Sequence, residues 1–203
     1  MEIEYKYRVP DIDTFGAISR DKLLSSAVRI AMDAKYYDTP ERILRAGAVT
    51  LRLRREDIAG GHAATVCCVK MPAPGGDALE AGLRRRLEFE CEADTVEEGL
   101  RTLFAQGVPA DLLRAACKRG LEPTATVRYT RLEAVVSAET ASAASAVYTV
   151  CLDRGILGIT PFMEMEIEHR SGDFAVTAAA AHALAARYAL VPEERSKYAR
   201  ALL

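Results

Sequence analysis

The stretch that decides the fold is Met1-Glu2-Ile3-Glu4-Tyr5-Lys6, at the start of the chain. On an extended strand, successive side chains point to opposite faces. Glu2, Glu4 and Lys6 therefore share one face, and apolar groups share the other. For a single strand, a charged face of this kind is usually the solvent-facing side of a sheet. The pattern becomes informative because it recurs along the chain.

The same alternation of charged and apolar residues marks several later segments. Residues 48–56, 83–92 and 156–170 show it most clearly, and single charges fall in 62–71, 121–137 and 145–153. The charged positions are Arg52, Arg54, Lys70, Arg84, Arg86, Glu88, Glu90, Glu92, Arg128, Asp153, Glu164, Glu166, Glu168 and Arg170. A solvated sheet face usually includes Ser, Thr, Asn and Gln, which are almost absent from these faces. A barrel with charges inside and apolar faces outside explains the pattern better, since eight strands can close around a small ligand.

The remaining periodicity predicts an α+β domain that covers residues 1–203. Eight strands are expected at 1–9, 28–38, 48–56, 62–71, 83–92, 121–137, 145–153 and 156–170, with a tight turn at Gly155 before the last. Helices are expected at 11–26, near 41–44, at 95–104, 109–118 and 173–188, and around Lys197. Residues 72–82 contain two prolines and three glycines and indicate a loop. We therefore expect one eight-stranded antiparallel, tunnel-like β-barrel with a charged lumen and flanking helices.

Composition narrows the classes of function. The chain has 203 residues, of which 50% are hydrophobic, and its formal net charge is −2. Near-neutral charge gives no overall field for nucleic acid, so no nucleic-acid partner is expected. No apolar run is long enough to span a membrane, and no secretory signal is visible. The five cysteines lack CxxC spacing, which favours reduced thiols and a cytoplasmic location. The sequence leaves open whether the protein is a homodimer.

Electrostatics indicates what a charged lumen would hold. Removing an ion from water costs several kcal/mol unless partners compensate it. The basic set Lys6, Arg52, Arg54, Lys70, Arg86 and Arg128 therefore requires a dense anion. The carboxylates Glu2, Glu4, Asp153, Glu164 and Glu166 require a cation. A polyphosphate with Mg²⁺ or Mn²⁺ meets both demands, because hard divalent ions prefer oxygen ligands. The pattern contains no cysteine or histidine, which argues against zinc.

Taken in order, these charged motifs make the sequence resemble the CYTH superfamily, also called triphosphate tunnel metalloenzymes. The resemblance covers nearly the whole length of the chain. The family's Glu-x-Glu-x-Lys signature is similar to residues 2–6, and its Tyr-Asp-Thr followed by Leu and Arg-x-Arg is similar to 37–39, Leu44 and 52–54. Further matches are Lys70, residues 86–90 (Arg-x-Glu-x-Glu), Arg128, Asp153 before 157–158, Glu164-Met165-Glu166, and 196–198 (Ser-Lys-Tyr). The last acidic pair is matched to Glu164 and Glu166, which directly follow Phe162; the alternative pair is Glu166 and Glu168.

The resemblance implies a metal-dependent hydrolase of triphosphate-bearing substrates, with inorganic triphosphate as the first expectation and Mg²⁺ or Mn²⁺ as cofactor. Glu4, Lys6, Arg54 and Glu166 are the expected catalytic residues. Phosphate binding is assigned to Lys6, Arg52, Arg54, Lys70, Arg86, Arg128 and Lys197. Metal binding is assigned to Glu2, Glu4, Asp153, Glu164 and Glu166, with Glu88, Glu90 and Glu168 in supporting positions.

Three alternatives remain open. A thiamine triphosphatase or a class IV adenylate cyclase would use the same clamp, and only a pocket for the organic group would distinguish them. A polyphosphate-binding module without turnover is a different class of protein. The many carboxylates argue against that module, because anion binding alone needs only basic groups.

Overall fold

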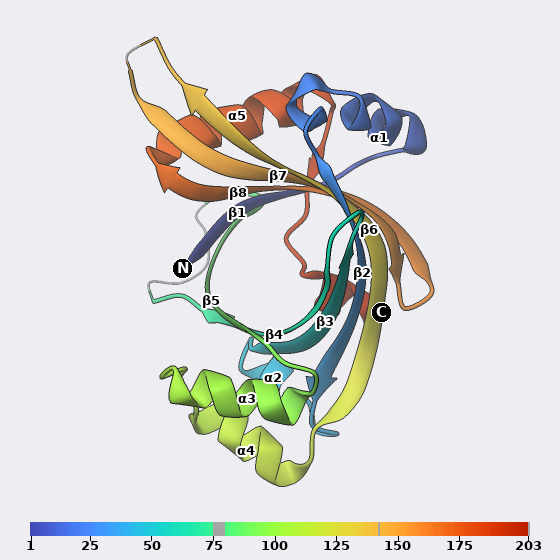
Figure 1. Cartoon of the computed structure of the whole chain (residues 1–203), viewed down its shortest axis with the longest axis vertical. Helices are drawn as coiled ribbons and strands as arrows, with labels where there is room; N and C mark the ends of the chain where they lie inside the picture. Colours follow the sequence, from blue (N-terminus) through green and yellow to red (C-terminus); the bar gives the residue numbers. More distant parts are fainter. Residues whose placement is uncertain (75–79, 142, 203) are drawn as a thin grey trace.

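The computed structural model describes residues 1–74, 80–141 and 143–202, and shows eight antiparallel strands that close into a barrel (Figure 1). Residues 75–79, within the loop predicted at 72–82, lie outside the described residues, as do 142 and 203. The strands are β1 (Glu2–Arg8), β2 (Val28–Asp38), β3 (Thr50–Ile58), β4 (Ala63–Pro72), β5 (Leu83–Glu92), β6 (Glu122–Glu139), β7 (Ser145–Leu157) and β8 (Thr160–Gly172). The predicted fold is confirmed.

The order of the strands shows how the barrel closes. It runs β5-β4-β3-β2-β6-β7-β8-β1, and β1 pairs in turn with β5, placing Glu2 opposite Arg86. The N-terminal strand therefore seals the barrel between β8 and β5. A two-residue strand that the sequence did not predict, β9 (Val191–Pro192), pairs with the end of β1. It leads the chain toward the last helix, α6 (Lys197–Ala201).

Helices cover the barrel on two sides (Figure 1). α1 (Ile12–Ser19), the short 3₁₀ helix η1 (Lys22–Leu24) and α5 (Phe174–Arg187) lie beside β7, β8 and β1. α2 (Ile43–Ala46), α3 (Val96–Ala105) and α4 (Asp111–Arg119) lie against the outer faces of β3, β4 and β5. Because these helices bury the outward apolar side chains, such as Leu51 and Ile167 (both 0% exposed), the alternate residues on each strand face inward.

A third apolar cluster lies inside the barrel. It joins inward residues of β2 and β6 to α6, and its centre is Tyr198, whose ring stacks on Tyr36 at 4.9 Å. The hydroxyl of Tyr198 also donates to Asp38 at the end of β2. α6 is thus anchored within the barrel; its Lys197 lines the charged lumen, and its Arg200 lines a second cavity at the end of the barrel.

Two predicted boundaries were wrong. The helix expected at 11–26 ends at Ser19, and the Asp21 side chain then caps the separate helix η1. Gly155 lies within β7, and the turn comes at Gly158, whose φ is +61°. Glycine is required at 155 for another reason: a Cβ there would lie 2.0 Å from the carbonyl oxygen of Arg128 on β6. It marks a close approach of two strands, and not a turn.

The five cysteines all carry free thiols. Among the described residues, no helix combines the length and apolar character needed to cross a membrane.

Candidate active site

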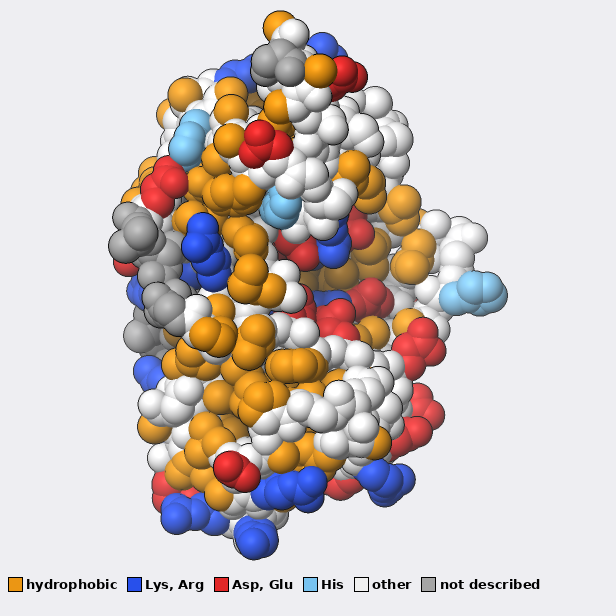
Figure 2. Space-filling view, turned by 90° about the vertical axis from the view of Figure 1, so that its left-hand side faces the viewer, with side chains coloured by type: hydrophobic (Ala, Val, Ile, Leu, Met, Phe, Trp, Pro, Cys, Tyr) orange, Lys and Arg blue, Asp and Glu red, His pale blue; other side chains and the backbone are white. Residues whose placement is uncertain are grey.

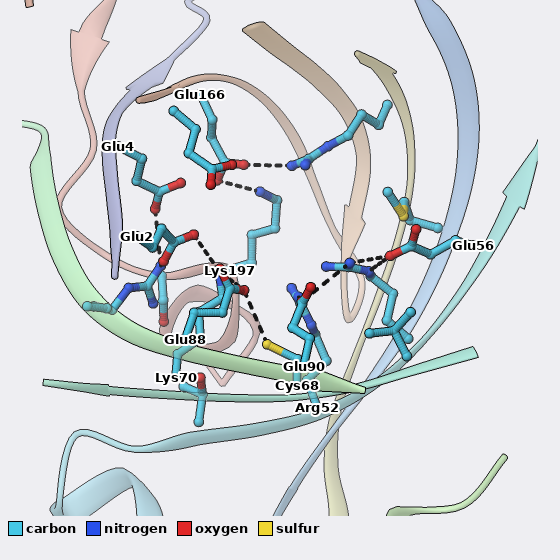
Figure 3. Close-up of a pocket in the computed structure, with 18 of the residues that line it drawn as sticks. Glu2, Glu4, Arg52, Glu56, Cys68, Lys70, Glu88, Glu90, Glu166 and Lys197 are labelled. Atoms are coloured by element: carbon cyan, nitrogen blue, oxygen red, sulfur yellow. Dashed lines mark hydrogen bonds and ion pairs between the residues drawn. The ribbon is translucent and has the colours of Figure 1, made fainter. Parts of the chain in front are cut away.

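The inward faces of the strands enclose a cavity of about 260 Å³ whose walls are mostly charged. Figure 2 shows acidic and basic side chains lying together in a hollow of the molecule, and Figure 3 shows them converging from separate strands. Of the 24 described residues that line the cavity, 16 are charged, with equal numbers of each sign. The acidic residues are Glu2, Glu4, Glu56, Glu88, Glu90, Glu133, Glu166 and Glu168. The basic residues are Lys6, Arg52, Arg54, Lys70, Arg86, Arg131, Arg170 and Lys197.

One wall is a network on β1, β4 and β5. Lys70 Nζ lies 2.6 Å from Glu2 Oε1 and 2.8 Å from Glu88 Oε1. Arg86 Nη2 lies 3.2 Å from Glu2 Oε2 and 3.1 Å from Glu4 Oε1. Burial raises the pKa of Glu2, but the charges of Lys70 and Arg86 outweigh that effect and lower the pKa. Glu2 therefore stays ionised and holds the two cations in place.

A second wall is formed by Arg52 and Arg54 on β3. Arg52 Nη2 is 3.5 Å and Arg54 Nη2 is 3.7 Å from the same oxygen of Glu90, and Arg54 Nε also donates to Glu56 at 2.6 Å. Among the described residues, the Nε–H groups of Arg52 and Arg86 are buried without a hydrogen-bond partner. A buried donor without a partner is costly. The lumen thus offers donors that an anionic ligand would satisfy.

The floor of the cavity is a compact cluster of ion pairs around Lys197 of α6. Lys197 Nζ lies 2.9 Å from Asp153 Oδ2 and 2.9 Å from Glu166 Oε1, and it also bonds to Glu164. Arg131 binds both oxygens of Asp153 at 2.8 Å and Glu166 Oε2 at 2.6 Å. Burial raises the pKa of Glu166, but the neighbouring cations, Lys197 first, lower it well below its usual range. Glu166 therefore stays ionised, pairs with the neighbouring cations, and does not act as a proton donor.

In the part of the chain that the structure describes, three groups of residues bring metal-ligating atoms within 4.8 Å of one another. They are Glu2, Glu88 and Glu168; Asp153, Glu164 and Glu166; and Cys68, Glu88 and Glu90. The second group is already neutralised, because Lys197, Arg131 and Arg200 make ion pairs with it. The third includes the Cys68 thiol, whose pKa is raised to about 12 by burial, so it would not offer a thiolate to a metal at neutral pH.

The first group fits a divalent cation best. Glu168 lies opposite Glu4 in the β1–β8 register, which is a repulsive pairing. Burial raises the pKa of Glu168 to about 7; Arg170 opposes this, and the charges of Glu2, Glu4 and Glu88 add to it. Glu2 Oε2 is also buried and, within the part of the chain that the structure describes, makes no hydrogen bond. This group also has cations beside it, since Lys70 contacts Glu2 and Glu88 and Arg170 contacts Glu168. What distinguishes it is that all three carboxylates line the cavity, and an all-oxygen set that faces the lumen suits Mg²⁺ or Mn²⁺.

The prediction for Arg128 was wrong. Its side chain is 63% exposed on the outer surface, where Nε contacts Asp33 at 3.1 Å. Arg131, three residues later and hence on the opposite face of β6, occupies the lumen instead. The signal that could have identified Arg131 is its alternation with Glu133. It was obscured because Val127 and Tyr129, on the same inward face, are apolar and pack against the cluster around α6.

The other predicted residues lie in or directly under the cavity. Glu2, Glu4, Lys6, Arg52, Arg54, Lys70, Arg86, Glu88, Glu90, Glu166, Glu168 and Lys197 line it. Asp153 and Glu164, both 0% exposed, lie beneath it and contact Lys197. The pair that faces the lumen is therefore Glu166 and Glu168. Besides Arg131, the sequence interpretation did not assign a role to Glu56, Glu133 or Arg170, each of which continues the charged alternation of its strand.

Comparisons with known proteins agree with this geometry. A family model described as the CYTH domain matches residues 1–202. A solved structure of a proposed adenylyl cyclase from Hippeastrum, described as having a dominant triphosphatase activity, is 19% identical with a TM-score of 0.66, over 98% of this chain and 94% of that one. A protein from Pyrococcus horikoshii has 19% sequence identity and a TM-score of 0.61. A proposed adenylate cyclase from Bacillus halodurans has 20% sequence identity and a TM-score of 0.61. Each alignment covers 97% of this chain and 95% of the other chain. No curated protein matches the sequence.

Proposed function

Because this chain belongs to the CYTH family, we propose that its lumen binds a triphosphate together with a divalent cation and hydrolyses a phosphoric anhydride bond, with inorganic triphosphate as the preferred substrate. The observation that carries the proposal is the lining of the cavity, where 16 of the 24 described residues are charged. A phosphate chain can pair with such walls along its whole length. An adenine or thiamine ring would instead require apolar surface, which is the smaller part of this lining, and Tyr36 within it is already stacked on Tyr198.

In this proposal, Arg52, Arg54, Lys70 and Arg86 bind the phosphate oxygens. Their positions are fixed in advance by Glu90, Glu56, Glu2 and Glu88, so little reorganisation is needed when charge develops in the transition state. Lys6, which is 4% exposed and lies between Glu4 at 3.4 Å and Glu166 at 3.1 Å, supplies a further positive charge. Glu166 acts as a positioning residue, because it holds Lys6, Arg131 and Lys197.

Glu2, Glu88 and Glu168 would hold the divalent ion, with Glu4 adjacent on the same face of β1. When bound, Mg²⁺ or Mn²⁺ would neutralise charge on the phosphates and help to activate water for attack. Ionised Glu168 is needed to hold the ion; in the absence of a cation, burial first and then the charges of Glu2, Glu4 and Glu88 raise its pKa. Because the lumen has these carboxylates as well as basic residues, it would bind a cation together with an anion.

A panel of substrates tests the proposal. The protein is incubated with Mg²⁺ or Mn²⁺ and, separately, inorganic triphosphate, ATP or thiamine triphosphate, and orthophosphate and cyclic AMP are measured. We expect orthophosphate to be released fastest from inorganic triphosphate, and only when the divalent ion is present. Cyclic AMP with pyrophosphate would identify a cyclase instead, and binding without any product would identify a module that does not catalyse turnover.

A further inference from the structure

A second cavity, of about 460 Å³, lies at the end of the barrel beyond α6. It is bounded by the end of β1, by the β7–β8 hairpin and by the segment around α6. Its apolar walls include Leu157, Phe162 and Met163, and Ile12 of α1 borders it with 48% of its surface exposed. None of the charged residues that line the first cavity lines this one, so the two are separate sites.

The charges around this cavity are strongly unbalanced. Among the described residues, four arginines (Arg8, Arg154, Arg195 and Arg200) line it, against a single carboxylate, Glu193. Glu193 is already paired, since Arg195 Nε lies 3.2 Å and Arg200 Nη1 lies 3.8 Å from its oxygens. Within residues 1–74, 80–141 and 143–202, Arg8 and Arg154 make no ion pair. A cavity with apolar walls and two cations, Arg8 and Arg154, that have no counter-charge is complementary to an anion that carries an apolar body.

Arg200 gives this cavity a buried basic group. Its side chain is only 8% exposed, and its Nε–H is buried without a hydrogen-bond partner among the described residues. A guanidinium presents several donors in a fixed plane that matches carboxylate and phosphate groups. One free, buried donor at the edge of the cavity therefore offers a place for the anionic group of a ligand.

The same arginine connects this cavity to the floor of the lumen. Arg200 and Lys197 lie three residues apart on α6 and both bind the buried carboxylate of Glu164. Lys197 also pairs with Glu166, which lines the lumen. An anion that draws Arg200 away from Glu164 would leave Glu164 to attract Lys197 more strongly, at the expense of its contact with Glu166.

We propose that the cavity beyond α6 binds a small organic anion, with an apolar body against Phe162 and Met163 and its charge toward Arg8, Arg154 and Arg200. Through Arg200, Glu164 and Lys197, occupation of this cavity weakens the binding of triphosphate in the lumen. Two sites linked in this way must affect each other's affinity by the same factor. The binding site stands on its own, and only the linkage rests on the proposed function of the lumen.

The fluorescent probe 8-anilinonaphthalene-1-sulfonate tests the site, because it joins a sulfonate to an aromatic body. We expect it to bind the folded protein, and N-phenyl-1-naphthylamine, which lacks the sulfonate, to bind at least about tenfold more weakly, since charge-assisted contacts are lost. The double variant Arg8→Gln/Arg154→Gln should weaken binding of the sulfonate by a similar factor. The matched control Arg101→Gln/Arg119→Gln, on exposed positions of α3 and α4, should not.

A lumen variant separates this site from the first. Arg54→Ala should leave binding of the sulfonate within about twofold of the unmodified protein, while Arg8→Gln/Arg154→Gln should leave binding of inorganic triphosphate unchanged. Equal affinity of both naphthalene probes, or loss of sulfonate binding in Arg54→Ala but not in the double variant, would overturn the proposed site. For the linkage, calorimetry should show weaker binding of triphosphate at saturating sulfonate, and an unchanged affinity would contradict it.

Discussion

Arg128 and Arg131 show how finely the site depends on the direction of single side chains. Both lie on β6, yet Arg128 is 63% exposed outside the barrel and Arg131 is 13% exposed inside it. A shift of one position on a strand reverses the face. The sequence therefore predicted most of the lumen correctly where charged and apolar residues alternate cleanly, as in β1 and β5. It assigned the wrong arginine in β6, where the inward face is partly apolar.

At this scale, two substitutions test the roles assigned in the lumen. Glu4→Gln and Arg54→Ala should each reduce turnover of inorganic triphosphate by at least about 100-fold, a typical loss for groups that stabilise transition-state charge. Arg128→Ala is the matched control and should retain nearly the full rate, because its side chain lies outside the barrel. A normal rate in Arg54→Ala, or a large loss in Arg128→Ala, would show that the phosphate-binding face has been assigned wrongly.

At the scale of elements, the strands were easier to predict than their ends. The predicted strands at 28–38 and 83–92 coincide with β2 and β5. The β7–β8 turn was misplaced because a glycine within a strand resembles a turn signal, although Gly155 serves the close approach of β6. β9 is only two residues long and depends on pairing with β1, a contact that local sequence does not reveal.

Gly155 gives a test of this packing. Gly155→Ala would place a Cβ 2.0 Å from a backbone oxygen of β6, and relieving that overlap should cost at least about 1–3 kcal/mol of the free energy of unfolding. Gly16→Ala in α1 is the control: the nearest atom is the flexible end of Arg20 at 3.3 Å, so we expect no loss, or a gain of up to about 1 kcal/mol. Denaturant unfolding of both variants measures the difference. A neutral effect at 155 would refute the packing argument.

The contact between η1 and α5 gives a test that depends on pH. The Asp21 carboxylate accepts from Leu23 N at 3.0 Å and lies 2.9 Å from Arg187 Nη1. The hydrogen bonds from Leu23 and Tyr188 lower the pKa of Asp21 below its ordinary value of 3.8. A lowered pKa in the folded state contributes stability above about pH 4, and this stability disappears as the pH falls through the lowered pKa.

We therefore expect Asp21→Asn to reduce the free energy of unfolding at pH 7 by about 1–3 kcal/mol, as is typical for a hydrogen-bonded charge. Its deficit relative to the unmodified protein should shrink below about pH 4. Asp13→Asn, at an exposed position in the first turn of α1, is the control and should change stability little at either pH. A deficit for Asp21→Asn that stays constant from pH 7 to pH 3 would contradict this role for the carboxylate.

At the scale of the whole molecule, closure of the barrel brings the charged residues that alternate along separate strands together in one cavity. Its outer faces are buried by helices on two sides, and its inner face gathers charges from residues as distant as Glu2 and Lys197. The sequence could predict the lumen because most strands alternate charged inward residues with apolar outward residues, although β2 has an apolar inward face. It could not predict which carboxylates line the cavity and which lie beneath it, since that depends on where α6 brings Lys197 and Arg200.

The most direct test of this account is calorimetric binding of inorganic triphosphate, with Mg²⁺ or with a chelator. We predict one triphosphate per chain in the presence of Mg²⁺, weaker binding with the chelator, and loss of at least about 100-fold in affinity for Arg52→Ala/Arg54→Ala, because two charge-assisted contacts are removed. Arg128→Ala should bind as the unmodified protein does. Equal binding by the double variant would show that the inward-facing charges do not form the site for triphosphate.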